Sequence, residues 1–304
     1  MQDYAIEVRK LKKSYGSFTA VNEISFNVRK GEIFSLLGPN GAGKTTTIEI
    51  MEGVRKRDSG EMSIFGIDPG KNRKALLNIA GILPQDFNFI NNVTPTESLR
   101  FYIGSLSAES DPMELLRMVE LDDKCNTVFE KLSGGQKQKL GLAMSLVNDP
   151  EVLFLDEPTA GLDPISRRAI WKVIEDLKKR GKSIVLTTHY LEEAENLADY
   201  VSIINHGEIV AKGSPSDIVR EYHDHDTMVV HVDDQKVMNG IDLGVDYTIQ
   251  GRSVTINLTD NAQFFVVVDK FRQLGITITD LTLKRESLED VFIRMVDGDN
   301  SSEN

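Results

Sequence analysis

The stretch Gly38-Pro39-Asn40-Gly41-Ala42-Gly43-Lys44-Thr45 matches the pattern G-x-x-x-x-G-K-[ST] at every fixed position. The apolar run 33–37 precedes it and predicts a buried strand, whereas residues 46–52 predict the first turns of a helix. Glycine permits the tight turn that points successive backbone N–H groups into one concavity, and the helix dipole adds positive charge there. Strand, loop and helix in this order disfavour a chance glycine-rich turn. The stretch therefore predicts a binding site for a nucleoside triphosphate.

Two side chains at the end of this stretch suit a phosphate ligand. Lys44 can reach the terminal phosphates, and the hydroxyl of Thr45 can ligate Mg²⁺. Upstream, residues 5–28 alternate apolar and polar around Tyr15-Gly16-Ser17, which predicts a strand pair. An isolated aromatic in a strand more often belongs to the core, but Tyr15 lies one hairpin before the phosphate loop. Stacking of its ring on a base is therefore the alternative.

Length and cysteine content limit the class of protein. A length of 304 residues suggests about two domains. The single cysteine, Cys125, excludes an intrachain disulfide and fits a reducing cytosol. Residues 1–7 lack the basic start and apolar core of a signal peptide. The longest apolar runs, such as 264–268, are far too short to cross a bilayer, so any membrane role needs a partner chain.

The charge of the chain is acidic and uneven. The net charge of −12 and the pI near 5.0 argue against a protein that binds nucleic acid by neutralising phosphates. From Val219 onward there are 8 Lys and Arg against 16 Asp and Glu, whereas the residues before it carry only the remaining −4. This shift in composition predicts a domain boundary near residue 220.

Two adjacent carboxylates follow the wholly apolar run 152–155, which predicts a strand buried on both faces. Asp156 and Glu157 would be costly to desolvate at that position unless they have a chemical role. Asp156 suits Mg²⁺, directly or through water, and Glu157 suits a general base that polarises water toward the γ-phosphate. A solvated strand end is the alternative, and Lys44 upstream disfavours it.

Two further polar residues end predicted strands. Gln85 closes the predicted strand 81–85, where it could reach a metal or an attacking water, because ligands of open α/β sheets gather at strand carboxyl ends. A solvated amide is the ordinary alternative. His189 ends the predicted strand 183–189. A single histidine is more often structural, yet this position suits contact with the γ-phosphate.

A second glycine turn, Ser133-Gly134-Gly135-Gln136, leads into the helical stretch 137–144. Ser133 predicts a helix N-cap, and the glycines let a ligand approach the first-turn amides. The turn is thus either a cap alone or a second anion site, remote from the first along the chain. Residues 161–164 predict another turn, which is followed by an amphipathic helix at 165–180.

With these motifs in this order, the chain resembles the nucleotide-binding subunit of ATP-binding cassette (ABC) transporters over about residues 4–217. GPNGAGKTT, which includes Thr46, resembles Walker A, and VLFLDEP resembles Walker B. LSGGQ resembles the ABC signature, which other phosphate-loop families lack. Gln85 resembles the Q-loop residue, Asp163 the D-loop residue and His189 the H-loop residue, and Tyr15 resembles the aromatic that stacks on adenine. The resemblance implies an α/β P-loop NTPase cassette with a mixed-sheet core, an N-terminal antiparallel β subdomain and a helical subdomain at about 86–149.

The same resemblance implies a subunit that binds and hydrolyses ATP with Mg²⁺ and powers export through a separate integral-membrane permease. It would then be cytoplasmic, on the inner face of the cell membrane, with residues 86–110 against the permease and no nucleic acid bound. Two ATPase subunits, as a homodimer or a heterodimer, would meet head to tail. Ser133 and Gly135 of one would then contact the γ-phosphate held by Lys44 of the other.

The resemblance also assigns the site residues. Catalysis falls to Glu157, His189 and Gln85, and the metal to Thr45, Gln85 and Asp156. Nucleotide contacts fall to Tyr15, to the nine residues Gly38, Pro39, Asn40, Gly41, Ala42, Gly43, Lys44, Thr45 and Thr46, to Ser133, Gly134, Gly135 and Gln136, and to Asp163.

The predicted domains are a cassette at 1–218, a small α+β accessory domain at 219–296 and a disordered polar tail at 297–304. Residues 286–292 resemble the C-terminal extension of exporter-type ABC ATPases of the drug, sodium and polysaccharide groups. The accessory domain is predicted to contain a strand at 227–232, a hairpin at 246–258, helices at 261–274 and 287–295, and a strand at 276–283. His223 and His225 are metal-ligand types, but alternating charge at a junction favours a solvated linker.

Two other classes of protein compete with a transporter subunit. Soluble ABC proteins that act on ribosomes or DNA usually carry two cassettes or long coiled-coil insertions, and this sequence shows neither. A phosphate-loop kinase or GTPase is disfavoured by LSGGQ and by the lack of a guanine-reading motif.

Overall fold

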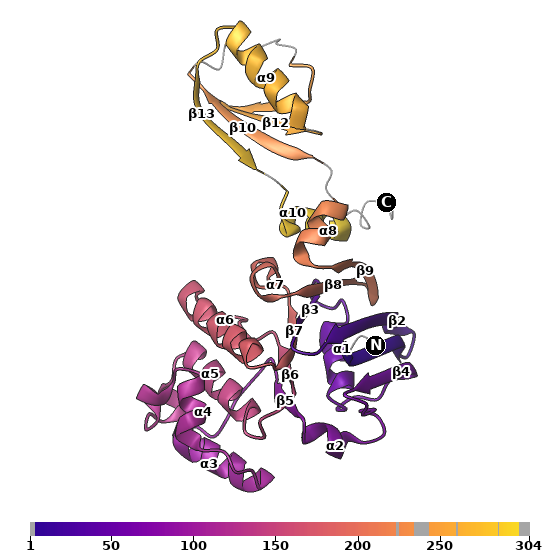
Figure 1. Cartoon of the computed structure of the whole chain (residues 1–304), viewed down its shortest axis with the longest axis vertical. Helices are drawn as coiled ribbons and strands as arrows, with labels where there is room; N and C mark the ends of the chain where they lie inside the picture. The colour runs from indigo at the N-terminus through magenta and orange to yellow at the C-terminus, as the bar shows by residue number, and fades with distance from the viewer. Residues whose placement is uncertain (1–3, 223–224, 234–242, 260, 285, 298–304) are drawn as a thin grey trace. The chain divides into compact units, whose positions relative to one another are not determined.

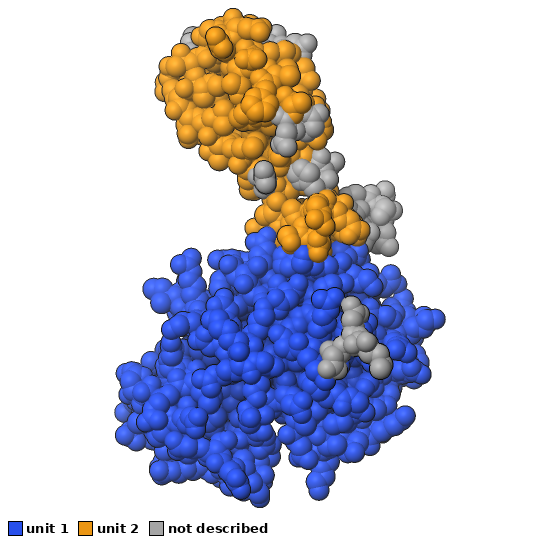
Figure 2. All heavy atoms as spheres, viewed as in Figure 1, with its two compact units in different colours: residues 1–215 blue, residues 216–304 orange. Residues whose placement is uncertain are grey.

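The computed structural model describes residues 4–222, 225–233, 243–259, 261–284 and 286–297. The chain divides into two compact units, residues 1–215 and 216–304, which Figure 2 colours separately. His223 and residues 298–304 lie outside the described residues. The metal site considered at His223 and His225 therefore lies partly outside the described residues. Of the tail predicted at 297–304, only residue 297 is described.

The first unit is built on a six-stranded sheet in the order β5-β6-β7-β3-β8-β9. The strands are β5 Ala80–Leu83, β6 Val152–Asp156, β7 Ser183–Thr188, β3 Ile33–Leu37, β8 Tyr200–Asn205 and β9 Glu208–Gly213. All pairings are parallel except that of β9 with β8. Strands β3, β6 and β7 are buried along their whole length, as their apolar runs predict. Their carboxyl ends meet at one edge, where the nucleotide loop begins.

A three-stranded antiparallel sheet, in the order β2-β1-β4, stands beside this core. Its strands are β1 Tyr4–Tyr15, β2 Phe18–Arg29 and β4 Ser59–Ile64. The predicted strand pair is therefore confirmed, and its turn contains Gly16 at φ 61°. The ring of Phe26 on β2 stacks on Phe34 of β3 at 4.8 Å between centroids, which joins the two sheets through one apolar core.

Helices lie on both sides of the six-stranded sheet (Figure 1). Those of the first unit are α1 Lys44–Met51, α2 Arg73–Leu77, α3 Pro95–Leu106, α4 Pro112–Met118, α5 Gly134–Ser145, α6 Pro164–Lys179 and α7 Leu191–Leu197. Helix α3 begins at a reciprocal capping box that Thr94 and Glu97 form. Helices α3 to α5 share one apolar cluster with the inner face of α6, including Ile170 and Ile174. The same cluster includes Leu83 of β5 and Leu153 of β6, so it lies between these helices and the sheet.

The second unit contains a four-stranded antiparallel sheet in the order β11-β12-β10-β13. Its elements are α8 Pro215–Glu221, which begins at the boundary, β10 Asp226–Val232, β11 Tyr247–Gln250, β12 Ser253–Leu258, α9 Asn261–Gln273, β13 Ile278–Lys284 and α10 Leu288–Asp297. Met228 and Val230 are buried and alternate with partly buried or exposed positions on β10, and they pack with Val267 and Phe271 of α9. One face of the sheet is thus covered by α9 (Figure 1), and the predicted hairpin turns at Gly251.

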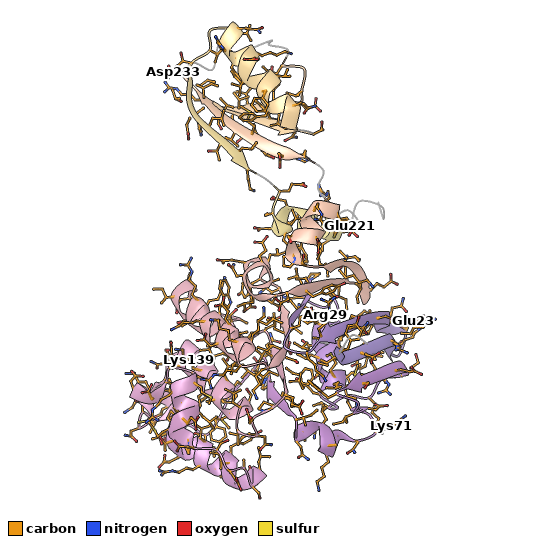
Figure 3. The ribbon with its side chains drawn as sticks, viewed as in Figure 1. Glu23, Arg29, Lys71, Lys139, Glu221 and Asp233 are labelled. Carbon is orange, nitrogen blue, oxygen red and sulfur yellow. The ribbon has the colours of Figure 1, made fainter. Side chains whose placement is uncertain are left out.

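Charged side chains line the outside of both units. Glu23 and Lys71 are exposed on the first unit, and Figure 3 shows them at its surface. No helix among the described residues combines the length and the apolar composition that a bilayer crossing requires.

Candidate functional site

The loop after β3 needs glycine at two positions where other backbone comes close. A Cβ on Gly38 would lie 2.3 Å from the carbonyl oxygen of Ile204, and one on Gly43 would lie 2.3 Å from that of Ala20. Gly43 is also the N-cap of α1 and has a φ of 107°. The loop is therefore held tightly from both sides, and the helix amides behind it point toward the concavity.

Lys44 is the buried cation of this loop. Its Nζ donates to the carbonyl oxygens of Gly38 at 2.8 Å and Pro39 at 3.1 Å, and it lies 3.5 Å from Oε1 of Glu157. Burial lowers the pKa of Lys44, and the carboxylate of Glu157 opposes this change. The ammonium group is thus fixed between the loop and the carboxyl edge of the sheet, where a phosphate would gain most from it.

Asp156 ends β6 with its carboxylate almost fully buried. It accepts a hydrogen bond from the hydroxyl of Thr187, and the hydroxyl of Thr45 also bonds to it. Burial raises the pKa of Asp156, the bond from Thr187 opposes this, and the charge of neighbouring Glu157 adds to the rise. Two buried carboxylates beside a hydroxyl form a set of hard oxygen donors that fits Mg²⁺.

Glu157 is the residue around which the predicted site residues converge. Its Oε2 lies 3.0 Å from Nδ1 of His189 and accepts from Nε2 of Gln85 at 3.4 Å, and Lys44 lies beside its other oxygen. The backbone here is left-handed, with φ 47°, and the amide donates to Thr187. A non-glycine residue adopts this conformation at a cost, which is typical of functional sites. The structure therefore gathers residues that are far apart in sequence around one carboxylate.

Gln85 and His189 both stand beyond the ends of their strands, and not within them as predicted. Strand β5 ends at Leu83, because Pro84 has no N–H to continue the ladder. Strand β7 ends at Thr188. Both side chains are consequently free of the sheet and reach across its edge toward Glu157.

Ser133 forms the predicted N-cap of α5. Its Oγ accepts from the amide of Gln136 at 3.3 Å, while Oε1 of Gln136 accepts from the amide of Ser133 at 2.9 Å. Ser133 and Gly134 are exposed, whereas a Cβ on Gly135 would lie 2.9 Å from Cβ of Ser166. In the part of the chain that the structure describes, no hydrogen bond joins this turn to residues 38–46. The turn is thus a cap and an exposed helix start, away from its own chain's nucleotide loop.

Asp163 and Tyr15 also have defined local roles. Asp163 is the N-cap of α6, and hydrogen bonds from Ser166 and from backbone amides lower its pKa. Tyr15 is 40% exposed, and Nζ of Lys13 and the guanidinium of Arg55 each lie 5.3 Å from its ring centroid. Tyr15 is therefore not a core aromatic, and stacking of its ring on adenine stays a prediction.

Two buried acids of the site were not predicted from the sequence. Glu52 caps the end of α1, and burial followed by the charge of Asp156 raises its pKa to about 8. Glu193 on α7 is completely buried and accepts from the side chains of Thr159 and Trp171. Glutamate on a helix is usually exposed, so nothing in the local pattern distinguishes these two.

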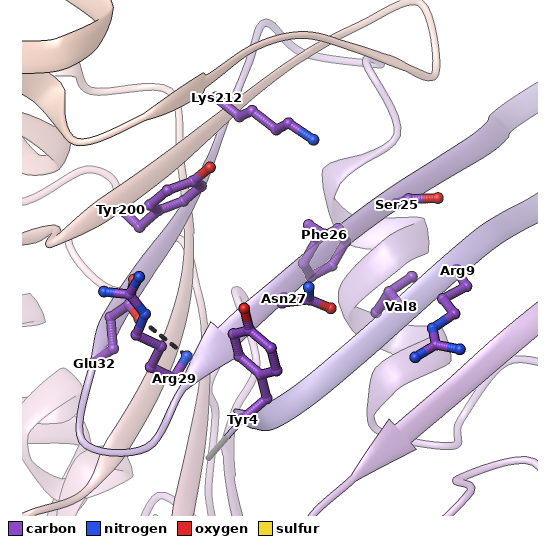
Figure 4. A pocket seen from close by; sticks show the side chains of 10 residues that line it. All are labelled: Tyr4, Val8, Arg9, Ser25, Phe26, Asn27, Arg29, Glu32, Tyr200 and Lys212. Carbon is purple, nitrogen blue, oxygen red and sulfur yellow. Dashed lines mark hydrogen bonds between the residues drawn. The ribbon is translucent and has the colours of Figure 1, made fainter. Parts of the chain in front are cut away.

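A separate cavity of about 290 Å³ lies between β1, β2 and the strands β8 and β9 (Figure 4). Its lining includes Tyr4, Phe26, Arg29, Glu32 and Tyr200, and the amide of Arg29 donates to the carboxylate of Glu32 at 3.0 Å. None of the residues predicted for the nucleotide site lines it. The cavity is therefore distinct from the edge where Lys44 and Glu157 meet.

A parallel-strand sheet whose carboxyl edge carries a phosphate loop, a buried lysine and two carboxylates defines a P-loop nucleoside triphosphatase. The family model described as ABC transporter matches residues 21–160. A relative from Rhizobium etli, "Nod factor export ATP-binding protein I", is 35% identical over 299 residues, which cover 96% of this chain and 93% of the relative. The chain belongs to the ABC transporter family, as an ATP-binding subunit that hydrolyses ATP.

Solved structures agree with this assignment. The structure of cbiO1 from Clostridium perfringens, described as part of the ABC transporter complex cbiONQ, is similar with a TM-score of 0.65 and 29% identity, over 72% of this chain and 92% of that one. A second similar structure, an ATP-binding cassette in a dimeric post-hydrolysis state bound to ADP and phosphate, has a TM-score of 0.61 and 26% identity, over 69% and 98% of the two chains. The predicted fold class is confirmed, and a transport role is favoured over the ribosome-acting or DNA-acting alternative.

Proposed function

We propose that this chain powers export through a separate integral-membrane permease, by ATP-dependent closure and reopening of two ATPase subunits. The relative from Rhizobium etli is named for export and aligns along almost the whole chain, including the second unit. The single observation that carries the proposal is the meeting of Lys44, Gln85 and His189 around Glu157. This arrangement places a general base, the two side chains beside it and a cation that can bind phosphate next to one another.

Glu157 is the proposed general base. It takes a proton from a water molecule, whose oxygen attacks the γ-phosphorus, and the bond to the bridging oxygen breaks to leave ADP and phosphate. His189 and Gln85 hold the carboxylate in place from one side, and Lys44 faces the phosphates from the other. Thr45 and Asp156, with Gln85 nearby, would hold Mg²⁺, which would supply positive charge against the phosphates.

The second ATPase subunit is proposed to meet the exposed turn Ser133-Gly134-Gly135-Gln136. The capped start of α5 offers backbone amides and a hydroxyl to an anion, and its own chain's loop does not use them. A γ-phosphate held by Lys44 of another copy can accept hydrogen bonds from these amides and this hydroxyl. The similar cassette described as dimeric with ADP and phosphate supports a dimer, and we propose a homodimer, with a heterodimer as the alternative.

The permease is proposed to dock on residues 86–110. Ile90 is 59% exposed, Phe101 is 65% exposed, and the ring of Phe101 lies edge-on to Phe89 at 6.5 Å between centroids. Apolar side chains gathered at a surface are typical of a partner site. The chain would then be held on the cytoplasmic face of the membrane by the permease. The net charge of −12 supports a protein partner over nucleic acid.

We assign residues 219–296 to an accessory domain that follows a cassette at 1–218. The acidic composition after Val219 and the separate apolar core around Phe271 support this division.

Co-purification from detergent-solubilised membranes tests the transport proposal. The tagged chain should bring down a polytopic membrane protein, and Phe101→Asp should lose it, because a charge is placed on the proposed docking surface. Phe265→Asp is the matched control, since Phe265 is 67% exposed in the second unit. Ribosomes in place of a membrane protein would overturn the transport proposal, whereas equal recovery of the membrane protein with Phe101→Asp would overturn the docking surface at residues 86–110.

A further inference from the structure

A buried carboxylate behind the site joins several separate segments. Oε1 of Glu193, on α7, accepts from the hydroxyl of Thr159 at 2.8 Å and from the indole Nε1 of Trp171 at 3.0 Å. Thr159 belongs to residues 158–163, named here the 158–163 loop, which connects Glu157 to α6. Trp171 lies on α6, which contacts α7. The carboxylate thus ties the loop and the helix after it to the segment that follows β7.

The end of β7 is connected to the helix that carries this carboxylate, since the amide of Glu193 donates to the carbonyl oxygen of Tyr190 at 3.1 Å. Burial raises the pKa of Glu193, and the side chain of Thr188, which directly precedes His189, gives the largest opposing contribution. The hydroxyl of Thr188 also accepts from the amide of Tyr190 at 2.9 Å. Burying a carboxylate is costly, and among the described residues Oε2 of Glu193 has no hydrogen-bond partner, so apolar packing alone does not account for an acid at this position.

A stack of side chains connects the same two segments independently. The ring of Tyr190 lies 4.1 Å from that of His189 between centroids, and the guanidinium of Arg167 lies 4.3 Å from the centroid of Tyr190. Arg167 is in the first turn of α6, directly after the 158–163 loop, and its Nη1 lies 3.6 Å from Oε2 of Glu192. The start of α6 and the residues after β7 are therefore joined by two sets of contacts.

We propose that Glu193 is a positioning residue that fixes the 158–163 loop to the end of β7, so that Glu157 and His189 keep their relation when a second subunit meets the loop. This inference rests on the proposed function, in which a second subunit meets the turn 133–136. The 158–163 loop lies beside that turn, since a Cβ on Gly134 would lie 3.3 Å from Cδ2 of Leu162. Glu193 itself touches no reacting atom. Through Glu193, a displacement of the 158–163 loop would also displace Glu157 and His189 of the same chain.

Replacing the carboxylate of Glu193 with an apolar side chain of similar volume tests the inference. Glu193→Leu leaves Thr159 and Trp171 without their acceptor, and kcat for ATP should fall between about 10-fold and 100-fold through misplacement of the base. KM and the affinity for MgATP should stay within about twofold, since residues 38–46 are unchanged. Glu193→Gln retains a carbonyl acceptor and should recover most of the lost rate. Glu195→Leu, at an exposed position on the same helix, is the matched control and should keep the parent rate.

Trp171 supplies a second readout, because it is the only tryptophan in the chain. Its single indole N–H resonance should move upfield in Glu193→Leu, and less in Glu193→Gln, as the charged acceptor is lost. Should Glu193→Leu fail to fold, Trp171→Phe removes one donor and leaves Glu193 in place, and it should lower kcat with KM unchanged.

The outcomes separate the two proposals. A parent protein that hydrolyses ATP, together with a folded Glu193→Leu or Trp171→Phe that hydrolyses it equally fast, overturns the role of Glu193 alone. A parent protein that binds no nucleotide overturns the proposed function itself.

Discussion

Nδ1 of His189 lies 3.0 Å from Oε2 of Glu157, although the two residues leave the sheet from different strands. Strands β6 and β7 are parallel neighbours, and Asp156 pairs with Thr187 in their register. The residues that follow the two strands therefore emerge at the same edge. The left-handed backbone of Glu157 then turns its side chain toward His189, Gln85 and Lys44.

Glu157→Gln is expected to keep ATP binding and to lose turnover by about 10²-fold to 10⁴-fold, because it removes the base and leaves the phosphate loop intact. Steady-state phosphate release and binding of a fluorescent ATP analogue measure the two properties. Glu151→Gln, at an exposed glutamate directly before β6, is the control. Turnover near the parent rate in Glu157→Gln would mean that another group is the base.

Gly43→Ala is expected to lower both stability and nucleotide affinity. Its Cβ would lie 2.3 Å from the carbonyl of Ala20 at a φ of 107°, so the loop must shift, at a cost of more than about 2 kcal/mol in the free energy of unfolding. Gly181→Ala is the control for backbone strain alone, since it has φ 83° and nothing within 4 Å. Urea unfolding and titration with MgATP check this. Unchanged affinity in Gly43→Ala would show that the loop does not hold the phosphates.

Glu52 is expected to make stability fall as the pH rises. The pKa of Glu52 in the folded state is about 8, above the ordinary 4.5. Its contribution to the free energy of unfolding is therefore complete below pH 4.5 and is lost as the pH rises through 8. Glu52→Gln stays neutral, and its melting temperature should exceed that of the parent by more at about pH 9 than at about pH 5. Glu61→Gln, exposed on β4, is the control. An equal difference at both pH values would contradict a buried, protonated Glu52.

Ser133→Arg is expected to spare nucleotide binding by one subunit and to block closure of two. The side chain adds bulk where the proposed partner's phosphate must approach, whereas Ser133→Ala removes the cap, worth about 1 kcal/mol, without adding bulk. Sedimentation in MgATP, with both substitutions placed in the Glu157→Gln background, compares them. Undiminished association of the Ser133→Arg protein would count against a second copy at this turn.

The features that were predictable from the sequence are those set by short patterns. The apolar runs of β3, β6 and β7, the glycine loop after β3 and the Ser133 cap each depend on a few neighbouring residues, and the structure has all of them. The order of these motifs along the chain was sufficient to indicate the family. Strands β8 and β9 were not predicted, although they complete the sheet beside β3.

The geometry of the site required the fold. Three glutamates occur within α7, and only packing against Trp171 makes Glu193 the buried one. Glu52 likewise becomes unusual only because Asp156 lies near it. The position of Gln85 beyond β5 depends on Pro84, and the exposure of Tyr15 depends on where β1 ends. Burial and contact are tertiary properties, and no pattern of neighbouring residues contains them.

The most direct test of the account is the mass of the Glu157→Gln protein in sedimentation, without and with MgATP. Closure of two copies over ATP that cannot be hydrolysed predicts a change from 34.0 kDa to twice that value on addition of MgATP. A protein that binds MgATP and still sediments at 34.0 kDa under every condition would contradict it.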